Sequence, residues 1–333
     1  MQPVIISWNI TKACNLNCVH CYRDAGSPSH DELTTQEALS LVDEIVLCGF
    51  KILILSGGEP LLRKDIFRII KYASDKGLRV VLGTNGTLIN REVALELKRS
   101  GLKRAGISMD SISEKEHDAF RKSEGAFKKA LLAMENLKKI NLEFQIHTTV
   151  TKDNINQIDK ITDFAVKCGA RAHHLFFLVG AGRGKDITSD QISPEDQEKL
   201  LENIARKIKN KEIEIEIKPT CAPSFMRIAK KAGLNLPYTK GCLAGASYCV
   251  ILPGGEVHPC PYLPVSAGNV RDKKFSRIWT ESRLFNELRL QDLKGSCASC
   301  DSKNICGGCR AHAYAVYGDY LMQDPFCIMS AKG

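Results

Sequence analysis

Three closely spaced cysteines near the amino terminus are the residues whose types and spacing point most directly to chemistry. Cys14, Cys18 and Cys21 lie in the stretch WNITKACNLNCVHCYRDAG with a C-x3-C-x2-C spacing, and no fourth cysteine follows nearby. Thiolates at this spacing can hold three irons of one cubane cluster and leave the fourth iron open. An open metal position is typical of a reactive site. A zinc site with His20 as a cramped fourth ligand, or incidental buried cysteines, are the alternatives.

A second group of cysteines lies in the carboxy-terminal part of the chain. The stretch CASCDSKNICGGC, residues 297–309, has a C-x2-C-x5-C-x2-C spacing, and Cys327 follows it. Upstream, Cys242, Gly255 and Cys260 make a C-x12-G-x4-C arrangement. Cysteines paired in this way bind iron–sulfur clusters or zinc. A thioredoxin-like redox pair is a further alternative, but no helix start of that kind surrounds these pairs.

The bulk composition fits a metal-binding protein of a reducing compartment. The chain has 333 residues and 14 cysteines, which, in a long chain without an export signal, favour metal ligation over disulfides. The first residues lack the charged and apolar regions of a signal peptide. No apolar run reaches the roughly 18 residues that a membrane span needs. We therefore expect a cytoplasmic protein that does not bind membranes.

The charge balance points to an acidic partner. The formal net charge is +9 at pH 7. Anionic clusters would offset part of this excess, and the remainder would attract an acidic substrate. Nucleic acid is not an expected partner, because no run of Arg and Lys is interleaved with aromatic residues.

The elements that must position the first cysteines alternate between strand and helix patterns. Thr34 and Glu37 predict a capping box at a helix start, and Gly49, Gly77 and Gly169 predict helix ends. Such alternation predicts an α/β fold with parallel strands, either an open doubly wound sheet or a partial barrel, and both carry their chemistry at the carboxyl ends of the strands. The predicted strands are residues 4–8, 52–56, 80–84, 105–109, 144–150 and 173–179.

The pattern changes after residue 180. Ser193 and Pro194 predict the start of a helix that runs to about residue 210, and residues 212–219 alternate as a strand does. A hairpin is predicted in residues 248–263, around Pro253-Gly254-Gly255.

Short polar motifs follow the predicted strands in order: SGGEP (56–60), GTNGT (83–87), SMDS (108–111) and TTVTKDN (148–154). Together with the C-x3-C-x2-C loop, they resemble the radical S-adenosylmethionine (SAM) superfamily over roughly residues 4–180. The resemblance implies a partial (βα)6 TIM-like barrel and a [4Fe-4S] cluster held by the three cysteines. SAM would chelate the open iron, and an electron from the cluster would cleave it to a 5′-deoxyadenosyl radical.

The same resemblance implies which residues contact SAM. The SGGEP motif would meet the methionine amino group through its backbone and the charge of Glu59. Ser108 and Asp110 would bond ribose or amino groups, and Arg121 would contact the methionine carboxylate. The implied SAM-binding residues are Gly57, Gly58, Glu59, Pro60, Asn85, Ser108, Asp110, Arg121 and Asn154.

The carboxy-terminal cysteines resemble the SPASM extension of radical SAM maturases, which carries auxiliary iron–sulfur clusters. The spacing between Cys306 and Cys309 departs from that family, which usually has three intervening residues. The resemblance implies one or two auxiliary [4Fe-4S] clusters. The ligand sets it implies are Cys297, Cys300, Cys306 and Cys327 for one cluster, and Cys242, Cys249, Cys260 and Cys309 for the second. Cys48 and Cys168 are predicted core residues, and Cys221 is left unassigned. The implied organisation is a radical SAM core (1–180), a connecting segment (181–235) and an auxiliary-cluster domain (236–333).

Over its whole length, the chain resembles the radical SAM enzymes of the siroheme-dependent heme pathway, and most of all the heme b synthases. That family would oxidatively decarboxylate two propionates of iron-coproporphyrin III to vinyl groups. The alternatives are deacetylation of didecarboxysiroheme and modification of a peptide or protein, as SPASM maturases do. A peptide-binding leader domain of winged-helix type, common in such maturases, is not expected ahead of the first strand. A non-enzymatic electron-transfer module would lack the ordered SAM motifs.

Five residues are candidates for contact with the substrate or SAM. His173 and His174 are adjacent on the last predicted strand, so only one of them can face the active site. That histidine, or His147, is a candidate ligand of a porphyrin iron, and Arg183 a candidate partner of a propionate. Tyr22 is a candidate to pack under SAM or donate a hydrogen bond to it. The alternatives are hydrogen-bonded core histidines and a solvated arginine. We also expect a flavodoxin or ferredoxin as electron donor, and a monomer.

Overall fold

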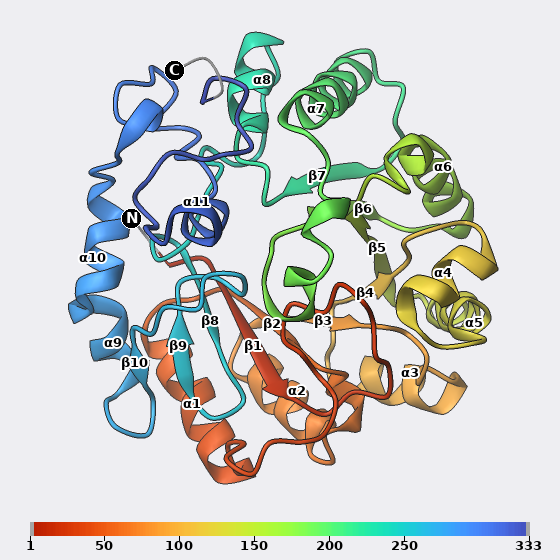
Figure 1. The fold of residues 1–333 in the computed structure, drawn as a ribbon. Coiled ribbons are helices and arrows are strands. Elements are labelled where there is room, and N and C mark those ends of the chain that lie inside the picture. The colour runs from red at the N-terminus through yellow and green to blue at the C-terminus, as the bar shows by residue number, and fades with distance from the viewer. Residues whose placement is uncertain (1–2, 331–333) are drawn as a thin grey trace.

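A single ten-stranded sheet organises the residues that the computed structural model describes, 3–330 (Figure 1). Its strand order is β10-β9-β8-β1-β2-β3-β4-β5-β6-β7. Strands β1 to β8 are parallel to one another, and β9 and β10 add an antiparallel meander beyond β8. The strands are β1 Ile5–Thr11, β2 Ile52–Gly57, β3 Arg79–Thr84, β4 Arg104–Ser108, β5 Glu143–Val150, β6 Ala172–Phe177, β7 Glu216–Thr220, β8 Tyr248–Ile251, β9 Glu256–His258 and β10 Gly268–Asn269.

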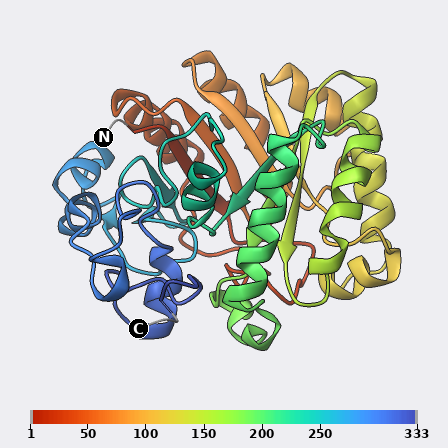
Figure 2. The same ribbon diagram turned by 90° about the horizontal axis from the view of Figure 1, so that it is seen from above.

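The helices of the first two thirds of the chain cover the outer side of this curved sheet, as Figure 2 shows in red to green. The α/β architecture with six successive parallel strands is thereby confirmed. The helices are α1 Thr35–Leu47, α2 Ile66–Asp75, α3 Arg91–Arg99, α4 Glu114–Arg121, α5 Ala126–Lys139, α6 Ile158–Cys168, α7 Pro194–Lys209, α8 Phe225–Lys231, α9 Phe275–Glu281, α10 Arg283–Leu290 and α11 Arg310–Tyr317.

The two faces of the sheet differ in burial. Side chains that point toward the helices are fully enclosed, as Leu53 and Leu55 show at 0% exposure. Side chains of the opposite parity are half-buried on β2, as Ile54 shows, whereas those of β1, such as Asn9, are buried. Because successive strand residues point to opposite faces, the half-buried set lines the concave interior. The sheet therefore has a packed outer face and an interior that remains accessible.

The predicted helix ends are confirmed. Thr34 and Glu37 form the capping box of α1, and Gly169 caps α6 in the left-handed conformation. Gly49 and Gly77 also have positive φ where their helices end, a conformation that costs glycine little. Ser193 caps α7, which starts with Pro194.

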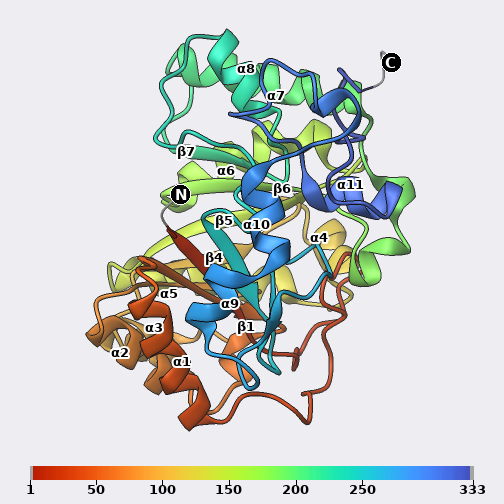
Figure 3. The same cartoon turned by 90° about the vertical axis from the view of Figure 1, so that its left-hand side faces the viewer.

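The sheet continues past the six predicted strands. The predicted strand at 212–219 is β7, which pairs with β6, and the predicted hairpin is β8–β9. β8 pairs in parallel with β1, at Ile5 and Tyr248. Helix α9 packs on α1, and Figures 1 and 3 place α9 and α10 beside β8 and β9. The cysteine-rich part thus extends the sheet of the core, and the boundaries at 180 and 235 remain a prediction.

No helix in the described part of the chain combines the length and the apolar character that crossing a bilayer requires.

The capping box of α1 gives a stability prediction. The Thr34 hydroxyl accepts from the Glu37 amide (3.3 Å), and the Glu37 carboxylate accepts from the Thr34 amide (2.7 Å). Thr34→Ala should lower the free energy of unfolding by about 1 kcal/mol, because an orphan amide at the helix start loses its acceptor. Chemical denaturation measures this loss, and Thr34→Ser should retain most of the stability. Equal stability of the Ala and Ser variants would contradict the role of the cap.

Candidate active site

The cysteine loop after β1 directs a hydrogen-bond donor at each of its three sulfurs. The Leu16 amide donates to Cys14 Sγ (3.4 Å), and the Ala25 amide donates to Cys21 Sγ (3.4 Å). Arg121 Nη1 donates to Cys18 Sγ at 3.7 Å. Donors of this kind stabilise thiolates, the form that ligates iron. The three sulfurs therefore fit a cluster, and the loop offers no fourth cysteine.

Arg183 connects several positions of the cysteine loop through hydrogen bonds and an ion pair. Its Nε donates to the Cys18 carbonyl (3.0 Å), and its Nη1 donates to the Ala25 carbonyl (3.0 Å) and pairs with Asp24 (2.7 Å). The Arg183 amide also donates to the Cys21 carbonyl (2.9 Å). The structure therefore directs Nε and Nη1 of this guanidinium at the loop, whereas Nη2 is buried without a hydrogen-bond partner among residues 3–330. Contact of Arg183 with a propionate stays a prediction. Arg183 is a positioning residue.

Burial sets the protonation of the loop in the absence of iron. It raises the pKa of the Cys14 thiol to about 11. It also raises the pKa of Cys18, although the nearby Arg121 charge opposes the effect. Both thiols are then protonated at neutral pH, so iron loading must release protons.

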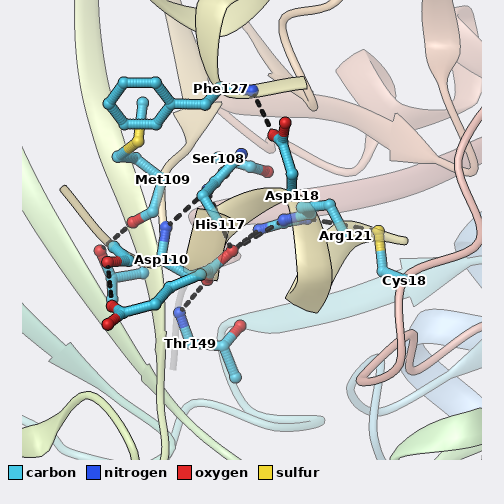
Figure 4. Close-up of polar contacts among 12 residues, drawn as sticks. Cys18, Ser108, Met109, Asp110, His117, Asp118, Arg121, Phe127 and Thr149 are labelled. Carbon is cyan, nitrogen blue, oxygen red and sulfur yellow. Dashed lines mark hydrogen bonds and ion pairs between the residues drawn. The ribbon is translucent and has the colours of Figure 1, made fainter. Parts of the chain in front are cut away.

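A buried ion pair ties the loop to the ends of two strands (Figure 4). Arg121, the last residue of α4, contacts Asp110 Oδ2 through Nε (2.7 Å) and Nη2 (2.6 Å). Asp110 Oδ1 accepts from the Thr149 amide (2.9 Å), and the Asp110 amide donates to His117 Nδ1 (3.2 Å). Burial raises the pKa of Asp110, but the Arg121 charge, the neighbouring histidines and the hydrogen bond from the Thr149 amide together outweigh it, and the net shift is downward. Asp110 therefore stays ionised, and its oxygens are engaged within the protein.

The side chain of Asn154, which was expected to contact SAM, forms its hydrogen bonds within the loops. Its Oδ1 accepts from the Thr151 amide (2.9 Å), and its Nδ2 donates to the carbonyls of Asp110 (3.0 Å) and Thr149 (2.8 Å). Ser108 is half-buried at the end of β4, and its hydroxyl donates to the Thr84 carbonyl at 3.4 Å. Of these two side chains, Ser108 is the one with capacity for a ligand.

Glu59 joins the ends of β2 and β3. It is completely buried, and its carboxylate accepts from the Thr84 hydroxyl (2.8 Å), the Asn85 amide (2.9 Å) and the Leu61 amide (3.2 Å). Burial raises the pKa of Glu59 to about 7. Pro60 begins a short 3₁₀ turn after it. The Glu59 side chain therefore positions the loops through internal hydrogen bonds.

The glycines of SGGEP meet the cysteine loop. The Gly58 amide donates to the Thr11 carbonyl (2.8 Å), and the Glu59 amide donates to the Ala13 carbonyl (2.7 Å). A Cβ on Gly58 would collide with the Ala13 carbonyl, and one on Gly57, where φ is +135°, with the Thr11 carbonyl. Glycines are required here because the backbone of the cysteine loop passes too close for a side chain.

Two residues inside the cysteine loop make contacts that the sequence did not predict. Asn15 Oδ1 accepts from Asn85 Nδ2 (3.0 Å), and Asn15 Nδ2 donates to the Thr87 hydroxyl (2.8 Å). His20 stacks on Phe120, with ring centroids 4.2 Å apart and 6° between planes. Burial lowers the pKa of His20 to about 3. The Asn-rich loop pattern and GTNGT were the available signals for Asn15, whereas nothing local indicated the stack.

The three candidate histidines separate between the two faces of the sheet. His173 is buried on the helix side, between the hydroxyls of Thr148 (2.8 Å) and Thr162 (3.0 Å). His174 and His147 lie in register on the interior face, with centroids 5.4 Å apart and rings nearly parallel. Of the adjacent pair, therefore, His174 faces the interior and His173 is a hydrogen-bonded core residue.

The interior histidines are neutral and share one amide. Gln145 Nε2 lies 2.7 Å from His147 Nε2 and 3.3 Å from His174 Nδ1. Burial lowers the pKa of His147 to about 4 and lowers that of His174 well below the usual value. Gly106 on β4 leaves the space that the His147 ring fills, since a Cβ there would collide with that ring. Neutral imidazole is the form that ligates metals.

Tyr22 lies between the first cysteine group and the second. Its hydroxyl donates to Asn9 Oδ1 (3.4 Å), and its ring is 5.0 Å from the Tyr262 ring at 53°. Cys21 precedes it, and Tyr262 follows Cys260 by two residues. Burial raises the pKa of Tyr22, so its hydroxyl stays protonated.

Cys221, left unassigned from the sequence, lies with Cys242, Cys260 and Cys309. Burial raises the pKa of the Cys221 thiol, and the charges of the other three raise it further. Cys309 and the flanking Cys221 and Cys260 belong to one small apolar cluster. The Tyr262 amide donates to Cys260 Sγ (3.3 Å). These four residues are therefore a candidate ligand set.

Cys249, expected in that set, lies elsewhere. It is 0% exposed within the large hydrophobic core. Cys48 is the cysteine that contributes to its raised pKa. Its place on β8, paired with Ile6 of β1, turns its side chain to the helix side of the sheet. This placement corrects the expected ligand set, with Cys221 in place of Cys249.

Cys297, Cys306 and Cys327 make a separate group with Cys300 in the same turn. Burial raises the pKa of Cys306 to about 12, with Cys327 and Cys297 adding to the shift. Gly307 and Gly308 both have positive φ, and the Gly308 amide donates to Cys306 Sγ (3.4 Å). Because both residues between Cys306 and Cys309 are left-handed, the two cysteines can belong to different candidate ligand sets despite the shortened C-x2-C spacing.

No three His, Cys, Asp or Glu side chains among residues 3–330 converge as the ligands of one metal ion would. A zinc site needs such convergence, whereas the thiolates of a cubane cluster bind separate irons.

Comparisons with protein families match both cysteine regions. The Radical SAM superfamily model matches residues 8–165, and the SPASM model, an iron–sulfur cluster-binding domain, matches residues 242–301.

Three curated proteins match nearly the whole chain. An AdoMet-dependent heme synthase of Methanosarcina barkeri is 46% identical, over 98% of this chain and 96% of that protein. A Fe-coproporphyrin III synthase of the same organism is 34% identical, over 99% of this chain and 89% of that protein. A mycofactocin maturase of Mycolicibacterium smegmatis is 33% identical, over 98% of this chain and 83% of that protein.

Solved structures share the fold. Streptococcus suis SuiB bound to S-adenosylmethionine superposes with a TM-score of 0.79 at 17% identity, covering 98% of this chain and 77% of that one. The structure of anSMEcpe with bound AdoMet superposes with a TM-score of 0.75 at 20% identity, covering 99% of this chain and 95% of that one.

Glu59 gives a pH-dependent stability prediction. Its pKa is about 7 in the folded chain and about 4.3 when unfolded, so the folded state holds an extra proton between these values. Stability from this group is complete below about pH 4.3 and is lost as the pH rises to about 7, by roughly 3 kcal/mol. The free energy of unfolding of wild type minus that of Glu59→Gln should therefore fall between pH 5 and 7 and then level off. Anaerobic denaturation across this range measures the difference, and one that rises with pH would contradict the assignment.

The corrected ligand set gives a second prediction. Cys221→Ala should lose the iron of one auxiliary cluster, because a ligand thiolate is removed. Cys249→Ala is the matched control and should keep that iron. Iron content and electron paramagnetic resonance after anaerobic reconstitution measure both variants. Iron loss in Cys249→Ala together with full loading of Cys221→Ala would restore the original set.

Proposed function

This chain belongs to the radical SAM superfamily and carries its SPASM extension, and we propose that it converts iron-coproporphyrin III to heme b. The observation that supports this substrate is the 46% identity to an AdoMet-dependent heme synthase, which extends over 98% of this chain. The identity covers both cysteine regions and the barrel between them.

The substrate changes at two propionate groups. Each loses a hydrogen atom from its β-carbon, then carbon dioxide and one electron, and becomes a vinyl group. A cluster with SAM on its open iron supplies the hydrogen abstraction when bound. The electron released at each conversion needs an acceptor, and a cluster ligated by four cysteines is suited to that role.

The residues of this chain would hold and orient the cofactors. Cys14, Cys18 and Cys21 would carry the open cluster, fixed by Arg183 on the loop backbone and by Arg121 at Cys18 Sγ. The auxiliary clusters would be held by Cys297, Cys300, Cys306 and Cys327, and by Cys221, Cys242, Cys260 and Cys309.

The interior face fits an anionic iron porphyrin. His147 and His174 present neutral imidazoles there, and either is a candidate ligand of the substrate iron. Arg79 (3.8 Å), Arg104 (2.8 Å) and Arg171 (3.6 Å) all approach the single carboxylate of Glu143. The amino-terminal ends of these strands, opposite the cysteine loop, therefore carry excess positive charge, which adds to the long-range attraction of the chain for a tetracarboxylate.

The other activities are less well supported. The Fe-coproporphyrin III synthase and the mycofactocin maturase are less similar, at 34% and 33% identity. SuiB and anSMEcpe, below 25% identity, share only the fold. A flavodoxin or ferredoxin as electron donor, and a monomeric state, are parts of the proposal that no comparison addresses.

Incubation with iron-coproporphyrin III tests the proposal. The anaerobically reconstituted enzyme with SAM and dithionite should form 5′-deoxyadenosine and heme b, with two losses of formic-acid mass visible by mass spectrometry. Substituting Cys14, Cys18 and Cys21 by Ala should abolish both products and leave the auxiliary cluster signals. Formation of 5′-deoxyadenosine with an unchanged porphyrin would overturn the substrate while retaining the radical chemistry.

A further inference from the structure

Lys218 is a cation without a counterion on the interior face of the sheet. It lies in the middle of β7 in register with His174, and its side chain is half-buried, whereas its neighbour Ile217 is buried on the helix side. Across residues 3–330, no carboxylate lies within ion-pairing distance of its Nζ, and no acceptor within hydrogen-bonding distance. Its Nζ lies over the Tyr238 ring, 5.6 Å from the ring centroid.

Partial burial disfavours the charged form of this ammonium, and an anion beside it would offset that effect. Burial lowers the pKa of Lys218, and the charge of Glu216 only partly compensates. Arg104, a cation on β4, is by contrast satisfied by Glu143 (2.8 Å) and Gln145 (3.4 Å). A half-buried ammonium without an acceptor favours an anion beside it.

The surroundings select the kind of anion. Lys218 pairs with His174, and His174 stacks on His147, so a flat ring system on either imidazole would bring its edge toward β7. A lysine binds as a point charge on a flexible stem, which suits a carboxylate on a short arm. Resting on the function proposed above, we infer that Lys218 anchors one of the two propionates that the porphyrin keeps.

The retained propionates are the better partners for a chemical reason. A reacting carboxylate must give up its negative charge as carbon dioxide leaves. An ammonium at hydrogen-bonding distance stabilises that charge and opposes the departure. A propionate that persists in the product gains from the same contact, so it both fixes the ring and leaves the reacting arms free.

Equilibrium binding tests the anchor. The cluster-loaded enzyme is titrated with iron-coproporphyrin III, with heme b and with the tetramethyl ester of the iron-coproporphyrin, and binding is followed by absorbance. Lys218→Met should weaken both iron-coproporphyrin III and heme b by about tenfold to a hundredfold, the range for a charged hydrogen bond. The ester should bind wild type and Lys218→Met equally, since it offers no carboxylate.

The controls separate charge from shape. Lys218→Arg should retain most of the affinity, and Lys218→Gln should resemble Lys218→Met. Lys230→Met removes an exposed lysine of α8 and should bind as wild type does. Affinity for SAM should be unchanged in every variant, because Lys218 lies away from the cysteine loop along the sheet.

The outcomes distinguish the inference from the proposed function. Unchanged affinity of Lys218→Met for both porphyrins would overturn the anchor alone. Weakened binding of iron-coproporphyrin III with unchanged binding of heme b would assign Lys218 to a reacting propionate and overturn the inference. A loss of SAM affinity would assign it to the cofactor. Wild type that binds no iron-coproporphyrin III would overturn the proposed function itself.

Discussion

The buried contact of Arg121 with Asp110 is the interaction on which the cysteine loop depends. It joins the end of α4 to the end of β4, and Asp110 continues to the amide of Thr149 at the end of β5. The same guanidinium reaches Cys18 Sγ at 3.7 Å. Both partners are less than a tenth exposed, so breaking one would leave an unpaired charge in a dry site. The position of a sulfur is thus coupled to two strands.

A common logic governs the polar residues of the site. Glu59, Asp110, Asn154 and Arg183 carry groups of the kind that bind cofactors, yet the loops themselves engage most of these groups. Within residues 3–330, Arg183 Nη2 is left without a hydrogen-bond partner. Their internal bonds hold the strand ends in place before any ligand arrives. Such preorganisation lowers the cost of binding. The groups with free capacity are fewer, and they include Ser108, the interior histidines and the sulfurs.

The strands, helix ends and cysteine regions could be predicted from the sequence, because periodicity, caps and cysteine spacing are local signals. Thr34 with Glu37, and Ser193 with Pro194, appear where they were expected. The roles of particular side chains could not be predicted in the same way. Cys221 and Cys249 differ by which face of the sheet they occupy, and the pairing of β8 with β1 decides this. Arg183 was expected at a substrate, but its partner Cys18 is far away in the chain. Both differences depend on contacts between residues that are far apart in the chain, and the local spacing of residues does not encode such contacts.

The sheet ends at β7 on one side and at β10 on the other. A closed barrel of eight strands has an interior just wide enough for its own side chains or one small ligand. Here the parallel series runs from β8 to β7, and these two strands are not paired with each other, so the series does not form a closed barrel. The width of its interior is therefore not set by strand number and tilt alone, as it is in a closed barrel.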